Sequence, residues 1–141
     1  MYVTIEEIKH ICNTEDMGNP VAVKGIVTWH RDADYYNAGS WRGTKKYEGG
    51  GVLINQTLHT LDLMMCFGGK AKKVKASMNN FSLNGVIEVE DTATAYIEYE
   101  NGAKGIFFAT NAYAVSSAVE FEVLFEKDCF SVKDGKLYRN G

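Results

Sequence analysis

The sequence predicts an α+β domain in which a mostly antiparallel, open-faced β-sheet carries helices packed on one face. Apolar residues recur with helical spacing near the N-terminus and over residues 51–66, whereas strand-type patterns joined by short turns fill the second half of the chain. The chain has 141 residues, 45% of them hydrophobic, and a single proline. These values are typical of one globular domain, here expected to span residues 1–141.

Composition excludes several classes of protein. Acids and bases are interspersed and give a net charge of −3, so no basic patch for nucleic acid is present. No apolar run approaches the roughly 20 residues that span a bilayer. The three cysteines, Cys12, Cys66 and Cys129, are odd in number and widely spaced. This pattern favours reduced thiols in a cytoplasmic protein over a disulfide framework or a zinc ribbon.

The first elements follow from capping and breaker signals. Thr4 is an N-cap candidate for a short helix over Ile5 to Cys12, with Glu7 in the capping-box position. Met17 to Pro20 stops this helix, and the β-branched run Val21 to Trp29 predicts a strand. From Asp32 to Glu48 the periodicity disappears and aromatic residues accumulate, which predicts a long loop of the kind that carries function.

The next helix is expected from Gly51 to Cys66 or Phe67. It places Asn55, His59 and Asp62 on one stripe. Its second stripe is purely apolar, consists of Ile54, Leu58, Leu61 and Met65, and is expected to be buried. The glycines that precede the helix lack the pattern of a phosphate loop, so we expect them to provide backbone flexibility and close approach at the helix start.

The remaining segments predict strands. The expected strands are Ala71 to Met78, Thr92 to Tyr99, Lys104 to Thr110, Val119 to Glu126, Cys129 to Val132 and Lys136 to Tyr138. Polar and apolar residues alternate over Ala71 to Met78, so this strand is expected to be half-buried. Asn101-Gly102 and Asp134-Gly135 predict hairpin turns. The face of the sheet that no helix covers would expose Tyr96, Ile106 and Phe108, and we expect self-association to a homo-oligomer through it.

His59 is the strongest catalytic candidate, because imidazole titrates near neutral pH and acts as a general acid or base. Pattern alone favours a hydrogen-bonded core histidine instead. A metal site formed by Asn55, His59 and Asp62 is a weaker alternative. Asparagine is a poor transition-metal ligand, and neither His10 nor His30 stands in a ligand motif with His59. We therefore expect no metal.

Several motifs occur together in one order. They are Tyr35-Tyr36, Trp41-Arg42-Gly43, Glu48 to Leu53, Asn55-Gln56 and His59 to Leu63. This combination resembles the C-terminal substrate domain of the Gfo/Idh/MocA oxidoreductases, the glucose-fructose oxidoreductase and inositol dehydrogenase group. The resemblance covers nearly the whole chain, because Ile5 to Gly25 is similar to the connection into the first strand of that domain.

The resemblance implies an NAD(P)-dependent dehydrogenase that acts on a sugar, cyclitol or related polyol. It implies that His59 and Asn55 are the catalytic residues of this chain, with a lysine of the separate nucleotide domain acting beside His59. Where this chain has Asn55 the family often has aspartate, and an amide cannot serve as a base. The substrate side of the cleft would be lined by Tyr36, Trp41, Arg42, His30 and Arg31.

The dinucleotide motif of that family is missing. No G-x-G-x-x-G follows a strand, so we expect this chain alone to bind no cofactor, whereas the full-length enzyme would bind NAD or NADP on a Rossmann domain in cis. The sequence is accordingly expected to be the C-terminal domain of a longer enzyme. The alternative is a non-catalytic α+β module that binds a ligand or dimerises.

Overall fold

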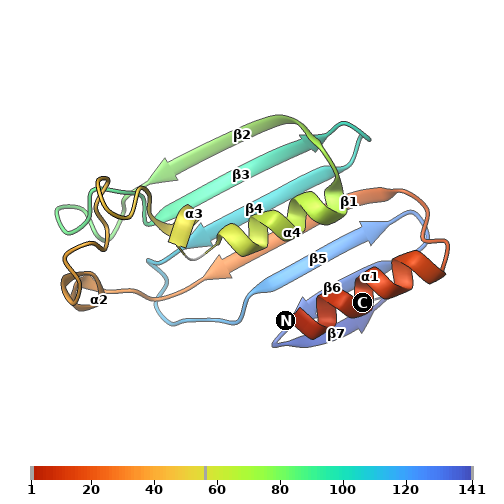
Figure 1. Cartoon of the computed structure of the whole chain (residues 1–141), viewed down its shortest axis with the longest axis horizontal. Coiled ribbons are helices and arrows are strands. Elements are labelled where there is room, and N and C mark those ends of the chain that lie inside the picture. Colours follow the sequence, from red (N-terminus) through yellow and green to blue (C-terminus); the bar gives the residue numbers. More distant parts are fainter. Residues whose placement is uncertain (1, 56, 141) are drawn as a thin grey trace.

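The computed structural model describes residues 2–55 and 57–140, without the side chains of Tyr2, Val3 and Asn55. Within this part of the chain a seven-stranded sheet forms the centre of the domain (Figure 1), with the strand order β2-β3-β4-β1-β5-β6-β7. The strands are β1 Pro20–Thr28, β2 Ala71–Asn79, β3 Thr92–Tyr99, β4 Lys104–Thr110, β5 Glu120–Phe125, β6 Cys129–Lys133 and β7 Lys136–Arg139. The helices are α1 Tyr2–Thr14, α2 Ala33–Asn37, α3 Val52–Asn55 and α4 Leu58–Gly68. The predicted α+β class is confirmed.

The sheet is mixed, with one parallel pair. Strand β1 pairs in parallel with β4, where Val23 lies opposite Gly105, and antiparallel with β5, where Val23 lies opposite Val123. The other neighbouring strands are antiparallel. The parallel pair arises because the first strand of the chain lies between two later strands, so the long segment after β1 returns over one face before β4 forms.

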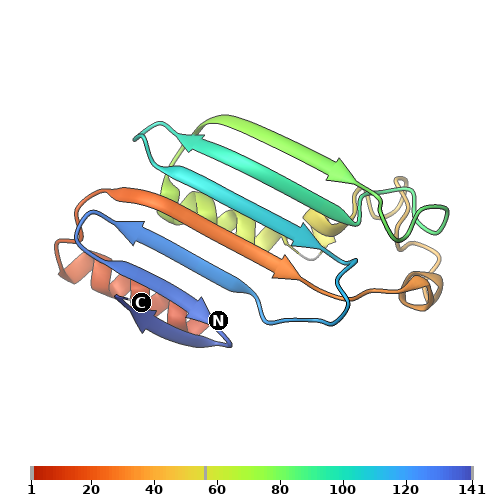
Figure 2. The same cartoon turned by 180° about the vertical axis from the view of Figure 1, so that it is seen from behind.

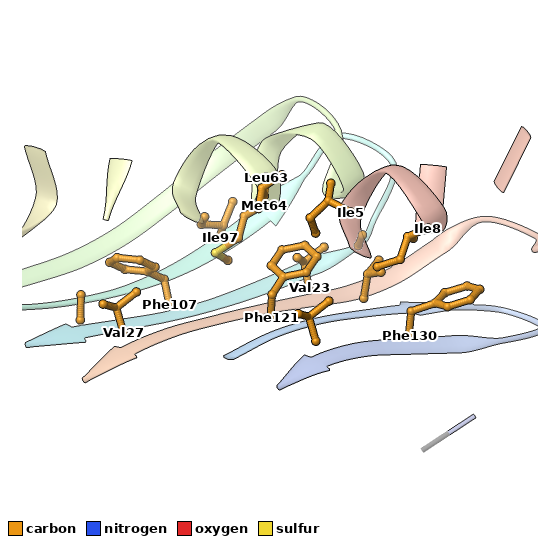
Figure 3. Close-up of a cluster of buried hydrophobic side chains, with 14 of the residues drawn as sticks. Ile5, Ile8, Val23, Val27, Leu63, Met64, Ile97, Phe107, Phe121 and Phe130 are labelled. Atoms are coloured by element: carbon orange, nitrogen blue, oxygen red, sulfur yellow. The ribbon is translucent and has the colours of Figure 1, made fainter. Parts of the chain in front are cut away.

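Both longer helices lie on the same face of the sheet. Figure 1 shows α4 across the middle strands and α1 over the β5 to β7 side, and Figure 2 shows the opposite face without a helix. The core lies between helices and sheet (Figure 3), where Ile8, Met64 and Phe121 are at most 1% exposed. The helix-free face is therefore the open face of an otherwise two-layered domain.

Close packing of α4 depends on small residues. A Cβ atom at Gly25 of β1 would lie 2.7 Å from Thr60 Cγ2 and 2.9 Å from Met64 Sδ. A Cβ atom at Gly68 would lie 2.3 Å from the Tyr99 ring, whose hydroxyl donates to the Met64 carbonyl at 3.1 Å. These glycines let the helix approach the sheet closely.

Thr4, the predicted N-cap, lies inside α1, which begins at Tyr2. Two further local expectations are wrong. The expected single helix after the glycines is divided into α3 and α4, and the fully buried Thr57 hydroxyl donates to the carbonyls of Val52 at 3.0 Å and Leu53 at 3.2 Å between them. The second error concerns β2, which is an edge strand exposed along almost its whole length rather than half-buried. Its alternating pattern resembles that of a covered strand, but α4 lies over the middle strands of the sheet instead.

Candidate functional site

His59 lies on the exposed side of α4. A hollow of about 760 Å³ lies along this side and is lined by Ile54, Leu58, His59, Leu61, Asp62 and Met65. His59 and Asp62, one turn apart, are both exposed. The prediction that these two side chains share a stripe is thus confirmed, and both are accessible to a second molecule or domain.

The apolar stripe of the same helix was expected in the core, and this expectation is wrong. Ile54 is 49% exposed, Leu58 61% and Met65 38%. The buried side of α4 instead carries Thr60, Leu63, Met64 and Gly68. Gly25 and Gly68 let α4 lie close to the sheet, so little space remains between them. The buried side of the helix therefore includes the small residues Thr60 and Gly68 beside Leu63 and Met64. The result is an apolar surface around an accessible imidazole, which is typical of a surface made for contact.

The start of α3 is held by a distant glutamate. One carboxylate oxygen of Glu90 accepts hydrogen bonds from the backbone N–H of Gly51 at 3.1 Å and Leu53 at 3.2 Å, and the Glu90 carbonyl accepts that of Val52 at 3.1 Å. These N–H groups have no partner within the helix, so an acidic acceptor is well suited to them. Glu90 thereby positions the segment that leads into His59.

The loop between β1 and α3 presents a stack of aromatic and cationic side chains. The Arg31 guanidinium carbon lies 5.2 Å from the ring centre of Trp29 and 5.1 Å from that of Tyr35. The Arg42 guanidinium carbon lies 4.5 Å from the centre of Tyr35 and 5.3 Å from that of Trp41. We call these five side chains the Arg–aromatic ladder. The ladder brings together Arg31, Arg42 and Trp41 of the predicted substrate-binding set.

Tyr36 and His30, the other two residues of the predicted substrate-binding set, lie outside the Arg–aromatic ladder. Tyr36 is 4% exposed and packs with Leu83 and Ile87, and its hydroxyl accepts a hydrogen bond from Asn111 at 2.8 Å. Burial raises the pKa of Tyr36 to about 12, so this phenol stays neutral at physiological pH. His30 is exposed, and its Nδ1 lies 2.9 Å from the Tyr113 carbonyl. Substrate contact by either residue stays a prediction.

The site is in two parts. Within the described residues, no hydrogen bond or ring contact joins His59 to the Arg–aromatic ladder. The side chain of Asn55, the second predicted catalytic residue, lies outside the described residues. Figure 1 places α3 and the start of α4 toward the same end of the sheet as the loop that contains α2.

Comparison with known proteins identifies this arrangement. Residues 5–131 match the family model described as the GFO/IDH/MocA C-terminal domain. The chain belongs to the GFO/IDH/MocA family. No match was found among curated proteins. The resemblance inferred from the motifs around the glycines and His59 is therefore confirmed.

Solved structures of GFO/IDH/MocA type share the fold. The WlbA dehydrogenase from Bordetella pertussis, in complex with NADH and UDP-GlcNAcA, is 27% identical with a TM-score of 0.86, over 96% of this chain and 42% of that chain. The WlbA enzyme from Chromobacterium violaceum, also with NADH and UDP-GlcNAcA, is 31% identical with a TM-score of 0.83, over 92% and 37%. Levoglucosan dehydrogenase in complex with NADH and levoglucosan, at 24% identity and a TM-score of 0.79, agrees in fold over 93% and 38%. The chain thus spans about two fifths of the length of these proteins.

The acidic segment that supports this GFO/IDH/MocA site was missed by sequence reasoning. Glu88 accepts the backbone N–H of Lys45 at 2.9 Å and donates its own N–H to the Gly43 carbonyl at 2.8 Å. Together with the contacts of Glu90 to α3, this joins both parts of the site to one segment. The only sequence signal is a run of acids directly before the strand at Thr92.

Asp91 fixes that segment from within. It is 0% exposed, and its carboxylate accepts the backbone N–H of Phe81 at 3.1 Å, Ser82 at 2.9 Å and Leu83 at 3.2 Å, and the hydroxyl of Thr92 at 2.8 Å. Burial alone would raise the pKa of Asp91, but these donors outweigh it and hold the pKa below its usual range.

The lowered pKa of Asp91 predicts loss of stability in acid. A carboxyl whose pKa is lower in the folded state stabilises the protein above its unfolded pKa of about 4, and this contribution is lost as the pH falls through the folded value. We expect Asp91→Asn to lower the free energy of unfolding at pH 7 by about 1–3 kcal/mol and to flatten the decline below about pH 4. Thermal melts between pH 2 and 7 measure both effects. An unchanged acid profile in the variant would contradict the assignment.

No metal site or membrane helix is found in the described part of this family member. None of its groups of histidine, cysteine, aspartate and glutamate could hold a metal ion. Across the same residues, no helix is long and apolar enough to cross a membrane.

Proposed function

We propose that this chain is the substrate-binding domain of an NAD(P)-dependent oxidoreductase that acts on a sugar, cyclitol or related polyol. The observation that carries the proposal is the exposed side of α4, where His59 lies beside an apolar stripe that no described residue of this chain covers. A surface of this kind fits contact with a nucleotide-binding domain in cis, with the reacting groups enclosed between the two.

The chemistry divides between the two domains. In the assembled enzyme NAD or NADP would accept a hydride from the substrate carbon, and its binding groups would come from the nucleotide domain, because the present sequence has no dinucleotide motif. His59 would take the hydroxyl proton together with a lysine of that domain. Asn55 would donate a hydrogen bond to the substrate, since an amide can orient a hydroxyl but cannot remove its proton.

The relatives support the substrate class. Both WlbA structures contain NADH and a sugar nucleotide, and the levoglucosan dehydrogenase structure contains NADH and a sugar. In this chain Trp41 is 47% exposed at the end of the Arg–aromatic ladder, where an indole can stack on a sugar ring. We propose that Trp41, Arg42, Arg31, His30 and Tyr36 form the substrate side of the cleft.

An activity assay tests this function. The chain is produced in one polypeptide with its nucleotide-binding domain and incubated with NAD or NADP and a panel of sugars, cyclitols and their acids. We expect NADH or NADPH absorbance to rise with at least one polyol. Absence of turnover with the whole panel, in a protein that binds the dinucleotide, would favour the alternative of a non-catalytic module.

A homo-oligomer through the open face of the sheet is the second part of the proposal. Ile106 is 58% exposed and Tyr96 is 41% exposed, and the two are cross-strand partners on the face without helices. Ion pairs flank them, including Lys104 with Glu98 at 3.4 Å. An apolar centre within a charged rim is the usual composition of a protein–protein interface.

Substitution on the open face should weaken this association. We expect Ile106→Lys to raise the dimer Kd by roughly tenfold or more, because it buries a charge at the centre of the contact. Val74→Lys is the matched control, since Val74 is 55% exposed but lies on the helix-bearing face with Ile97 as its partner. Light scattering across a concentration series measures both. A wild-type chain that stays monomeric at every concentration tested would contradict the proposed interface.

A cytoplasmic location is also proposed, on the cysteine pattern. Cys12, Cys66 and Cys129 are free thiols. Burial raises the pKa values of Cys12 and Cys129, which keeps those thiols protonated and weakly reactive. Free thiols of this kind are typical of a reducing compartment.

A further inference from the structure

The Arg–aromatic ladder carries two positive charges, and among the described residues their hydrogen-bond acceptors are backbone carbonyl groups. Arg31 Nη1 donates to the His30 carbonyl at 2.9 Å, and Arg42 Nη1 donates to the Tyr35 carbonyl at 3.0 Å. Neither arginine forms an ion pair with any described residue. The Nε atom of each is buried and has no hydrogen-bond partner in the described part of the chain.

Two carboxylates near the ladder in sequence accept backbone N–H groups, and the third, Asp34, forms no ion pair with either arginine within the described residues. Asp32 caps α2 by accepting the backbone N–H of Tyr35 at 3.0 Å. Glu48 accepts the backbone N–H of Gly43. The two guanidinium groups stack on the same Tyr35 ring, so each is close to another positive charge. Like charges held together in a half-buried position favour an anion as their counterpart.

We propose that the ladder binds the anionic group of the substrate, so that the enzyme acts on an acidic sugar rather than on a neutral one. The identification of the bound anion with the substrate rests on the proposed function. Anion binding by the ladder does not depend on that function. A guanidinium binds carboxylate and phosphate oxygens through paired N–H groups, and its aromatic neighbours limit its motion without neutralising it. Trp41 would stack on the sugar ring while Arg42 and Arg31 hold the carboxylate or phosphate.

Binding at the ladder can be followed by tryptophan fluorescence. The chain has two tryptophans, Trp29 and Trp41, and both belong to the ladder. Binding at the ladder is therefore expected to change the intrinsic tryptophan fluorescence, most directly through the half-exposed Trp41, because Trp29 also packs against the main core. The measurement needs neither cofactor nor turnover, so its failure and the failure of the dehydrogenase assay are independent results.

The experiment titrates the chain with glucuronate, glucose 1-phosphate and glucose while tryptophan fluorescence is recorded. We expect at least one anion to bind about tenfold or more tightly than glucose, and its affinity to fall as sodium chloride is added. Preference for glucuronate assigns a carboxylate, and preference for glucose 1-phosphate assigns a phosphate. Equal affinity for all three sugars, or no binding by any, overturns the proposal.

Variants locate the anion on the ladder. We expect Arg42→Gln and Arg31→Gln each to abolish the preference for the anion, whereas Arg42→Lys retains part of it because the charge remains. Lys46→Gln is the matched control, since it removes one positive charge from the same loop, where Lys46 stacks on Tyr47 and not on the ladder. Circular dichroism confirms that each variant is folded. An anion preference that persists in both arginine-to-glutamine variants would place the site elsewhere.

Discussion

Replacement of His59 by asparagine in the assembled two-domain enzyme is expected to lower kcat by about 10²–10⁴-fold. The physical reason is that asparagine retains a hydrogen-bonding side chain of similar reach but cannot take up the hydroxyl proton as hydride departs. Because His59 is exposed on α4, the change should leave the stability of this domain within about 0.5 kcal/mol of wild type. Steady-state kinetics with saturating dinucleotide measure the effect.

The control for His59 lies on the same helix. Cys66 is exposed two turns further along α4, and Cys66→Ser changes one atom without adding or removing a titrating base near the substrate. We expect its kcat to match wild type. A wild-type kcat in His59→Asn would remove His59 from the mechanism.

The strands of the second half were predictable because their signals are local. The predicted bounds of β3 and β4 match the structure, and the turns at Asn101-Gly102 and Asp134-Gly135 need only a few adjacent residues to form. The parallel pairing of β1 with β4 was not predicted, since it depends on which distant strands lie together. The same limit applies to β2. Polar and apolar residues alternate along this strand as predicted, but α4 lies over the middle strands of the sheet and does not cover it.

In the candidate site, too, residues with local sequence signals were predictable and residues that act through distant contacts were not. His59 could be found from its spacing and from the motifs around it, and Arg31, Arg42 and Trp41 from their composition. The contacts of Glu90 could not, because a carboxylate that accepts N–H groups 37 and 39 positions away leaves no periodic signal. The error in predicting which face of α4 is buried has a different cause. Hydrophobic spacing identifies a face that avoids water but does not say which surface covers it, and in our proposal that surface belongs to another domain.

Substitution of Gly51 by alanine is expected to be the most damaging change of a single methyl group near the site. A Cβ atom there would lie 1.9 Å from the Glu90 carbonyl oxygen, and backbone at both ends must move to relieve the overlap. Overpacking of this kind costs about 1–3 kcal/mol or more. We expect a fall in Tm of roughly 2–4 °C for each kcal/mol in a chain of this size.

The adjacent glycine supplies the control that separates close approach from loop flexibility. At Gly50 the three atoms nearest to a Cβ would all belong to the Ile54 side chain, with its terminal Cδ1 at 2.9 Å, and that half-exposed group can rotate away. Alanine reduces backbone freedom by the same amount at both positions, so a loop that needs flexibility would suffer equally from either change. We expect Gly50→Ala to change stability by less than about 0.5 kcal/mol, measured by the same thermal melts. Equal losses at Gly50 and Gly51 would show that the glycines act through flexibility, and a loss confined to Gly51 would show that contact with Glu90 sets the start of the helix pair that presents His59.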